Sequence, residues 1–369
     1  MKLLHISPGY LGSKVYTHLT KALNPLVDKQ LVYVAVPSET HIHQLPDDNV
    51  LISKCFNKWD RILFHYKQHK IFKDICQKVV LDLYDMLHAH FLFSGGYIAR
   101  KLFKNRGIPY VVTIRNTDVN IFLKYMPHLR SLGVKILLDA SAVIFLSEAY
   151  KNTVIDCYVP SVYRAQINDK STIVPNGISA FWLNNKYEDI RSPSIDMINL
   201  ICVCNVDSNK NLEGTIAACR HLISRGYDVS LTVVGKLLHP RYEQLVSDTP
   251  FVVRIPFCIQ EELIQHMRDS DIFIMPSKTE TFGLVYAEAM SQGLPVIYTK
   301  GQGFDTQFPD GEVGYAVPWD DPEYMADCIQ NIYSNYEHFS GNCIKLVDRF
   351  NWENIAKIHA SLYESICNK

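Results

Sequence analysis

The sequence lacks the features of membrane-spanning, disulfide-rich and zinc-binding proteins. No apolar run in its 369 residues approaches the roughly 18 residues that cross a bilayer. The ten cysteines are scattered without the paired spacing of a metal site, which is typical of buried thiols in a reducing compartment. The apolar N-terminal stretch is too short for a secretory signal and is better read as a first strand. We therefore expect a cytoplasmic protein.

Net charge is small, at −1, but the two halves of the chain differ. Residues 1–190 carry 23 Lys and Arg against 15 Asp and Glu, a net charge of +8; the remainder carries 14 against 23, a net charge of −9. This asymmetry predicts that the first half faces an anionic partner. We do not expect nucleic acid, because no recognition motif accompanies the charge. An anionic membrane surface or a phosphate-bearing acceptor fits better.

Apolar strand patterns alternate with helical patterns along the chain, which indicates parallel sheets covered by helices. A chain of this length can hold two such α/β domains. The polar stretch 184–194 is the best linker candidate. The expected strands span residues 2–7, 31–36, 85–90, 109–118 and 140–147 in the first half, and 198–204, 231–235, 252–255 and 271–275 in the second.

A basic and aromatic stretch covers residues 54–78, where seven Lys and Arg alternate with apolar side chains. One interpretation is an amphipathic helix that packs on the sheet and turns a charged face to solvent. The other is an interfacial helix that touches anionic lipid. The sequence leaves both open.

The most informative stretch runs from Pro276 to Met290. It follows a short apolar strand, and a helix is expected from near Gly283 to just before Gly293. A helix that starts directly after a strand presents free N–H groups and the positive end of its dipole to an anion. The hydroxyl residues before the helix are suitable N-caps: Ser277, Thr279 and Thr281.

Two carboxylates in this stretch require an explanation. Glu280 precedes the helix, where it could be a favourable charge or a ligand contact. Glu288 lies in a helix that is apolar on nearly every side, so burial would be costly unless the carboxylate accepts hydrogen bonds. Sugar or ribose hydroxyls would supply them. A solvated helix face is the alternative.

Glu280 and Glu288, with seven residues between them that include Phe282-Gly283, resemble the E-x7-E signature of family 4 retaining glycosyltransferases. The segment from Glu288 to Ile297 also resembles that family's EAM-x-x-G-x-PV-I continuation. The resemblance implies a GT-B fold and transfer of a sugar from a nucleoside-diphosphate sugar, with retention and without a cofactor. Glu280 would hold the sugar hydroxyls and Glu288 the ribose. The sugar and phosphates would meet the backbone of Thr281, Phe282, Gly283, Leu284 and Val285.

In this reading residues 1–185 form a Rossmann-like domain that binds the acceptor. Residues 186–348 form a second Rossmann-like domain that binds the nucleotide sugar. Residues 349–369 form a helix that packs back on the first domain. The sheets of both domains are expected to be parallel.

The loop from Asn205 to Lys210 resembles the family's GR-x-x-x-KG segment, whose Arg and Lys grip the diphosphate. Lys210 fits, although a lysine at a helix start could be a surface residue; Asn205 takes the Arg position. Cys258 lies in the segment that corresponds to the family's base-reading backbone, and its neighbour Phe257 could be core. Gly9 and Gly12 lie in the first strand–helix loop. A donor contact is expected there at Gly12, and the alternative is that both glycines are turn residues.

Two further residues are assigned to the catalytic set with Glu280 and Lys210. His90 ends a stretch that resembles the family's D-x-x-HAH strand, and Arg115 replaces the His of a T-x-HG-x-D pattern that retains Asp118. Arg115 suits a phosphate or carboxylate better than proton transfer, or it forms a salt bridge within the fold. His88 and His90 could ligate a metal, but a third ligand is not evident. With no Asp-x-Asp pair at the diphosphate either, we expect no metal.

The sequence thus predicts a metal-independent retaining glycosyltransferase. Its expected partners are a nucleoside-diphosphate sugar and a glycan, lipid-linked or phosphorylated acceptor in cell-surface polysaccharide synthesis. Peripheral contact with the inner face of an anionic membrane fits the basic first half. The alternatives are a nucleotide-sugar epimerase and a non-catalytic GT-B subunit, which Asn205 and Arg115 keep open.

Overall fold

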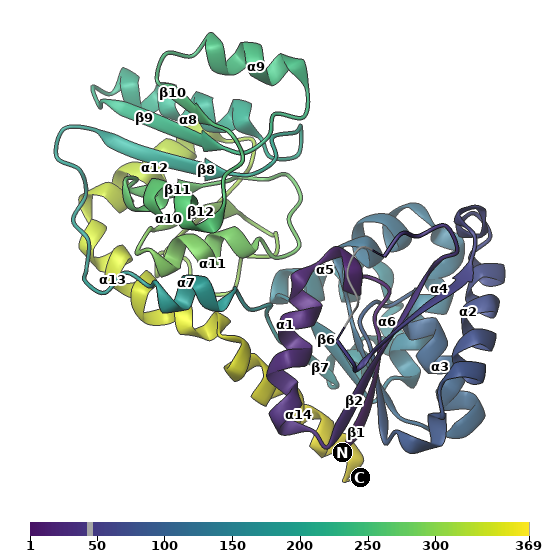
Figure 1. Ribbon diagram of the computed structural model, residues 1–369. Helices are drawn as coiled ribbons and strands as arrows, with labels where there is room; N and C mark the ends of the chain where they lie inside the picture. Colours follow the sequence, from purple (N-terminus) through teal and green to yellow (C-terminus); the bar gives the residue numbers. More distant parts are fainter. Residues whose placement is uncertain (43–46, 369) are drawn as a thin grey trace. The chain divides into compact units, whose positions relative to one another are not determined.

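The computed structural model describes residues 1–42 and 47–368, and the chain divides into two compact units (Figure 1). The first unit consists of residues 1–146, 151–176 and 352–369. The second consists of residues 147–150 and 177–351. Each unit is built on its own sheet.

The first unit contains a seven-stranded sheet in the order β3-β2-β1-β4-β5-β6-β7. Every pair in it is parallel, and the chain reverses its direction of growth between β1 and β4, as in a doubly wound fold. Ligands bind at such switch points, outside the carboxyl ends of the strands. The strands are β1 (Lys2–Ile6), β2 (Lys29–Pro37), β3 (Val50–Phe56), β4 (Met86–Ala89), β5 (Tyr110–Thr113), β6 (Ala142–Phe145) and β7 (Ser171–Ile173).

Helices cover both faces of this sheet. In Figure 1, α1 and α14 lie together, and the core between them and the sheet contains Leu3, Leu23, Met86 and Tyr363. The helices are α1 (Lys14–Leu23), α2 (Phe64–Lys78), α3 (Gly96–Arg106), α4 (Pro127–Asp139), α5 (Glu148–Tyr158), α6 (Ser161–Asn168) and α14 (Trp352–Cys367). Short turns of helix are η1 (Tyr10–Gly12), η2 (Asn24–Leu26), η3 (Lys58–Arg61), η4 (Leu81–Leu83) and η5 (Asp118–Leu123).

The second unit repeats the design with six parallel strands in the order β10-β9-β8-β11-β12-β13. Its switch point lies between β8 and β11. The strands are β8 (Ile198–Val203), β9 (Val229–Val234), β10 (Val252–Ile255), β11 (Ile272–Ile274), β12 (Val296–Thr299) and β13 (Gly314–Val317). The helices are α7 (Ala180–Asn184), α8 (Leu212–Ser224), α9 (Pro240–Ser247), α10 (Gln260–Arg268), α11 (Leu284–Ser291), α12 (Pro322–Ser334), α13 (Tyr336–Leu346) and η6 (Val347–Phe350).

The division of the chain lies at Asn176–Gly177, before the expected boundary at residue 185. Residues 177–191 belong with the second unit because they are anchored to it. The Ile178 N–H donates to the Phe350 carbonyl at 3.0 Å. The buried Arg191 guanidinium donates to four carbonyls, those of Met267, Arg268, Ser270 and Gln292. The polar stretch 184–194 is therefore a docked segment and not a free linker.

The basic stretch 54–78 is only partly helical, so the expectation of one helix was wrong. Residues 54–56 end strand β3, where their backbone pairs with β2, and the turn η3 separates them from α2. The helix α2 packs against β3 and α3, as the first interpretation predicted. In the described part of the chain, the helices are all too short or too polar to cross a bilayer.

Candidate active site

The switch point of the second sheet brings together the two loops that the sequence singled out. β8 pairs with β11, so the loop 204–211 and the segment 275–283 leave the sheet side by side. Asn209 joins them: its Oδ1 accepts from the Thr279 N–H and its Nδ2 donates to the Thr279 carbonyl, both at 2.9 Å. The sequence analysis missed Asn209, although the Asp207-x-Asn209 turn that shapes the loop is a local signal.

Lys210 and Glu280 form an ion pair at this junction. Their Nζ and Oε2 atoms lie 2.8 Å apart, and the two side chains are 20% and 19% exposed. Burial opposes the charge on Lys210, but the Glu280 carboxylate outweighs it and raises the pKa of Lys210. Gln302 fixes the backbone by accepting from the Glu280 N–H at 2.9 Å. The surface-lysine alternative for Lys210 therefore does not hold.

The N-terminus of α11 is open. Its N-cap is Gly283 and no side chain caps it, so the expectation of a hydroxyl cap was wrong. Gly283 has a φ of 76°, and a Cβ there would lie 2.4 Å from the Tyr286 ring. Among the described residues, no acceptor pairs with the N–H groups of Phe282, Gly283, Leu284 or Val285. These donors, together with the helix dipole, form a site for an anion.

Glu288 lies one turn further along α11 and is mostly buried. Burial raises the pKa of its carboxyl to about 7, and the nearby indole N–H of Trp182 offsets part of this shift. By geometry that indole N–H makes no hydrogen bond to a described residue. The environment argues against a solvated helix face. Trp182 lies 106 positions before Glu288, and no sequence pattern links the two residues.

The structure gives three of the expected donor-binding residues less support than it gives Lys210, Glu280 and Glu288. Asn205 is exposed and brings no cation to the loop after β8. Cys258 is half-buried after β10, and Phe257 is 69% exposed, which excludes it from the core. Gly12 is exposed with open space around it, whereas a Cβ at Gly9 would lie 2.9 Å from the Phe91 ring. Gly9 is the position in that loop that requires a glycine.

Arg115 and His90 belong to the first unit, at the carboxyl ends of β5 and β4. Arg115 is only 8% exposed, and its Nη1 donates to Asn176 Oδ1 at 2.7 Å. It forms no ion pair with a described carboxylate, so the salt-bridge interpretation was wrong. Asp118 is buried beside it and accepts three backbone N–H groups, those of Leu92, Phe93 and Arg115. Its pKa is raised by burial to about 6.

His90 lies in a fully buried histidine cluster that the sequence did not reveal. His5 Nδ1 lies 2.9 Å from His90 Nε2, and the potential ligand atoms of His5, His88 and His90 lie within 4.8 Å of one another. Both nitrogens of His5 and of His88 already have hydrogen-bond partners, which include Gln30, Thr113 and Tyr363. The third histidine that a metal would need is thus present, but its nitrogens are occupied. We interpret the cluster as a hydrogen-bonded core.

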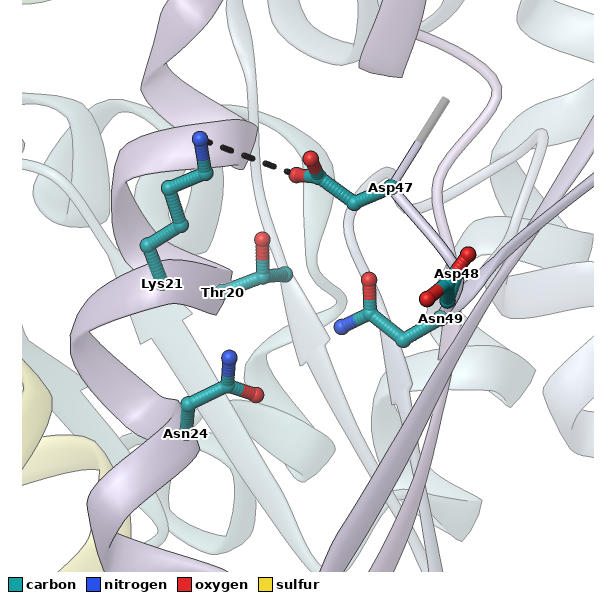
Figure 2. A pocket seen from close by; sticks show the side chains of 6 residues that line it. All are labelled: Thr20, Lys21, Asn24, Asp47, Asp48 and Asn49. Atoms are coloured by element: carbon teal, nitrogen blue, oxygen red, sulfur yellow. Dashed lines mark ion pairs between the residues drawn. The ribbon is translucent and has the colours of Figure 1, made fainter. Parts of the chain in front are cut away.

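Figure 2 shows a different, open pocket in the first unit. It is lined by Thr20, Lys21, Asn24, Asp47, Asp48 and Asn49. Lys21 and Asp47 form an ion pair of 3.7 Å across it, and the pocket contains none of the predicted site residues. Its residues 47–49 follow positions 43–46 in the sequence, which lie outside the described residues. We assign it no role.

Comparison with known proteins identifies the family of the chain. Residues 32–180 match the family described as Glycosyltransferase Family 4, and residues 198–335 match Glycosyl transferases group 1. The chain is 24% identical over 302 residues to a D-inositol 3-phosphate glycosyltransferase of Paenarthrobacter aurescens, covering 76% of this chain and 72% of the relative.

Solved structures support the fold. Sucrose-phosphate synthase from Thermosynechococcus elongatus superposes with a TM-score of 0.74 at 19% identity, over 99% of both chains. Anabaena HepE in complex with UDP-glucose gives 0.66 at 15% identity, over the whole of both chains. The expected family and the expected pair of Rossmann-like α/β domains are confirmed. With two matches that together cover more than half of its length, the chain belongs to the group 1, family 4 glycosyltransferases of GT-B fold.

Proposed function

We propose that this glycosyltransferase moves a sugar from a nucleoside-diphosphate sugar to an acceptor with retention at the anomeric carbon, and that the second unit binds the donor. The observation that carries the proposal is the Lys210–Glu280 pair beside the open N-terminus of α11. A cation and free N–H groups suit a diphosphate, and a carboxylate suits sugar hydroxyls. The UDP-glucose in the HepE structure supports a donor of this class.

Each residue of the second unit has a separate role in this account. Lys210 and the N–H groups of 282–285 stabilise the departing diphosphate with charges that are already in place. Glu280 orients the sugar, and Glu288 accepts hydrogen bonds from the ribose. Sugar transfer passes through an oxocarbenium-like state, so stabilising the leaving group is the main requirement. Lys210 and these N–H groups meet that requirement without a divalent metal.

The first unit is proposed to take a glycan, lipid-linked or phosphorylated acceptor at the inner face of a membrane, in cell-surface polysaccharide synthesis. Large apolar side chains are exposed on η3 and at the start of α2: Trp59, Ile62, Leu63 and Tyr66. Residues 54–78 carry seven basic and two acidic side chains, a net charge of +5. Apolar side chains ringed by lysines suit an anionic membrane surface. The phosphorylated inositol in the name of the Paenarthrobacter relative supports a phosphorylated acceptor.

A thermal-shift panel of UDP, GDP, ADP and TDP sugars tests the donor site. One nucleotide class is expected to stabilise the chain, by about 2.7 kcal/mol at 100 times its dissociation constant. If none of the nucleotide sugars stabilises the chain, the result would contradict the proposal and favour a non-catalytic subunit. Appearance of a new sugar nucleotide on incubation with donor alone would favour an epimerase.

A further inference from the structure

The carboxyl edge of the first sheet contains three buried polar atoms without partners. Ser7 Oγ, His90 Nδ1 and Arg115 Nε make no hydrogen bond to any described residue. They follow β1, β4 and β5, which are adjacent in the sheet at its switch point. Buried polar groups are nearly always paired in folded proteins. Three unpaired polar atoms on neighbouring strand ends indicate a polar network whose missing partners are supplied by a bound ligand.

Arg115 is the charged member of this set. The one hydrogen-bonded partner of its guanidinium within the described chain is the neutral Asn176, and the guanidinium lies over the Tyr16 ring at 5.2 Å from the ring centroid. The edge of Tyr16 in turn contacts His90. Nη2 has no partner among the described residues and is not one of the fully buried orphan atoms, so it is the part of the group left to meet a ligand.

One carboxylate lies near the guanidinium without pairing with it. The charge of Asp118 attracts Arg115, but its oxygens accept three backbone N–H groups and form no ion pair with the guanidinium in the described part of the chain. The histidines around the guanidinium are fully buried, and their pKa values are lowered by burial and by the positive charge of Arg115: His88, His90 and His359. A buried arginine ordinarily has a carboxylate partner. This one does not.

We propose that Arg115 is a specificity residue that binds an oxyanion, a phosphate or a carboxylate, carried by one of the substrates. The proposal rests on the proposed function and names a chemical class for one substrate. The planar guanidinium pairs with either anion through two parallel hydrogen bonds. The anion belongs either to a phosphorylated acceptor or to a transferred sugar that carries a carboxylate.

Thermal unfolding of the full chain in inorganic phosphate or sodium glucuronate tests this, with sodium chloride at equal ionic strength as the reference. Because phosphate would also occupy the donor site, the comparison uses Lys210→Met against Lys210→Met/Arg115→Met. Arg220→Met, at an exposed arginine of α8, is the matched control. We expect one anion to stabilise the single variant, and its apparent dissociation constant to rise about tenfold or more with Arg115→Met. The control should not change it.

The two anions distinguish the source. A response to phosphate alone assigns the oxyanion to the acceptor, and a response to glucuronate alone assigns it to the sugar. No response to either, or a response that Arg115→Met leaves intact, would overturn the proposal. Phosphate held by the remaining N–H groups of α11 would respond equally in both variants, so the difference between the variants reports on Arg115 and not on the donor site.

Stability without ligand separates this role from a structural one. An arginine that holds the fold together would lower the unfolding temperature when replaced by Met. A binding arginine without a carboxylate partner should leave that temperature equal or higher. A clear loss of stability in Arg115→Met, restored by Arg115→Lys, would contradict the assignment.

Discussion

Glu280 and Glu288 lie on the same short segment, yet their surroundings differ. Glu280 has a lysine 2.8 Å away and remains partly exposed. Glu288 forms no ion pair with a described residue and is mostly buried, and burial raises its pKa to about 7. The first environment suits a charge that orients a sugar. The second suits a carboxyl group that ionises when a ribose supplies hydrogen bonds.

Glu288 should make donor binding depend on pH. Ribose hydroxyls donate to the ionised carboxylate, so binding below pH 7 requires the neutral carboxyl to lose its proton. Affinity for the donor should therefore fall about tenfold for each pH unit below 7. Glu288→Gln should bind more weakly at pH 8 and show little dependence on pH between 5 and 8. Calorimetric titration measures both.

Glu323→Gln, at an exposed position of α12, is the matched control and should retain the wild-type profile. The same profile in Glu288→Gln as in the wild type would show that another group controls the affinity.

At the scale of elements, the sequence correctly predicted the strand and the helix that flank Glu280. The strand–turn–helix around the E-x7-E pattern was expected at 271–275 and from near Gly283, and β11 and α11 lie there. The apolar pattern of this strand and helix depends only on neighbouring residues, so it can be read from the sequence. The capping was not predictable, because the conformation of Gly283 is coupled to a distant loop. Gly303 crosses over the Thr281–Phe282 peptide, and its N–H donates to the Glu280 carbonyl at 2.6 Å.

Gly303 should therefore tolerate no side chain. A Cβ there would lie 1.8 Å from the Thr281 carbonyl oxygen, so Gly303→Ala must displace the segment that carries Glu280. We expect a loss of more than about 3 kcal/mol of stability and loss of donor binding. Denaturant unfolding provides the measurement.

Gly12→Ala is the control, because a Cβ at Gly12 would have nothing within 4 Å. It should change stability by less than about 1 kcal/mol. Equal losses of stability in the two variants would show that the contact of Gly303 with the Thr281–Phe282 peptide does not shape the site.

For the whole molecule, the alternation of strands and helices predicted parallel sheets covered by helices, and the chain length allowed two such domains. Their Rossmann-like form was implied by the family resemblance. The clusters that join distant positions were not predictable. His5 meets His88 and His90 across adjacent strands, and Glu288 meets Trp182. The linker prediction failed for a similar reason: a polar composition does not reveal that the Arg191 guanidinium donates to carbonyls far along the chain.

The surface of η3 and α2 should bind anionic vesicles. The wild type should sediment with vesicles of phosphatidylglycerol and phosphatidylcholine but not with phosphatidylcholine alone, and high salt should weaken the binding. Trp59 and Ile62 are 79% and 75% exposed. Replacing both with Ser should reduce binding at least about tenfold.

Ile195→Ser, at an isoleucine of the second unit that is 93% exposed, should bind as the wild type does. An equal loss of vesicle binding in the two variants would indicate non-specific hydrophobic binding and argue against a defined membrane surface.

The central claim is that Lys210 binds the diphosphate of the donor and Glu280 binds its sugar. Calorimetric titration of a nucleoside diphosphate and its sugar into the wild type, Lys210→Met and Glu280→Gln tests it most directly. Lys210→Met should weaken both ligands about tenfold or more. Glu280→Gln should weaken only the nucleotide sugar, because the sugar loses the carboxylate that orients it. The nucleoside diphosphate should not bind more weakly, because Lys210 is freed from its ion pair. Equal loss of both ligands in Glu280→Gln, or unchanged binding in Lys210→Met, would contradict the account.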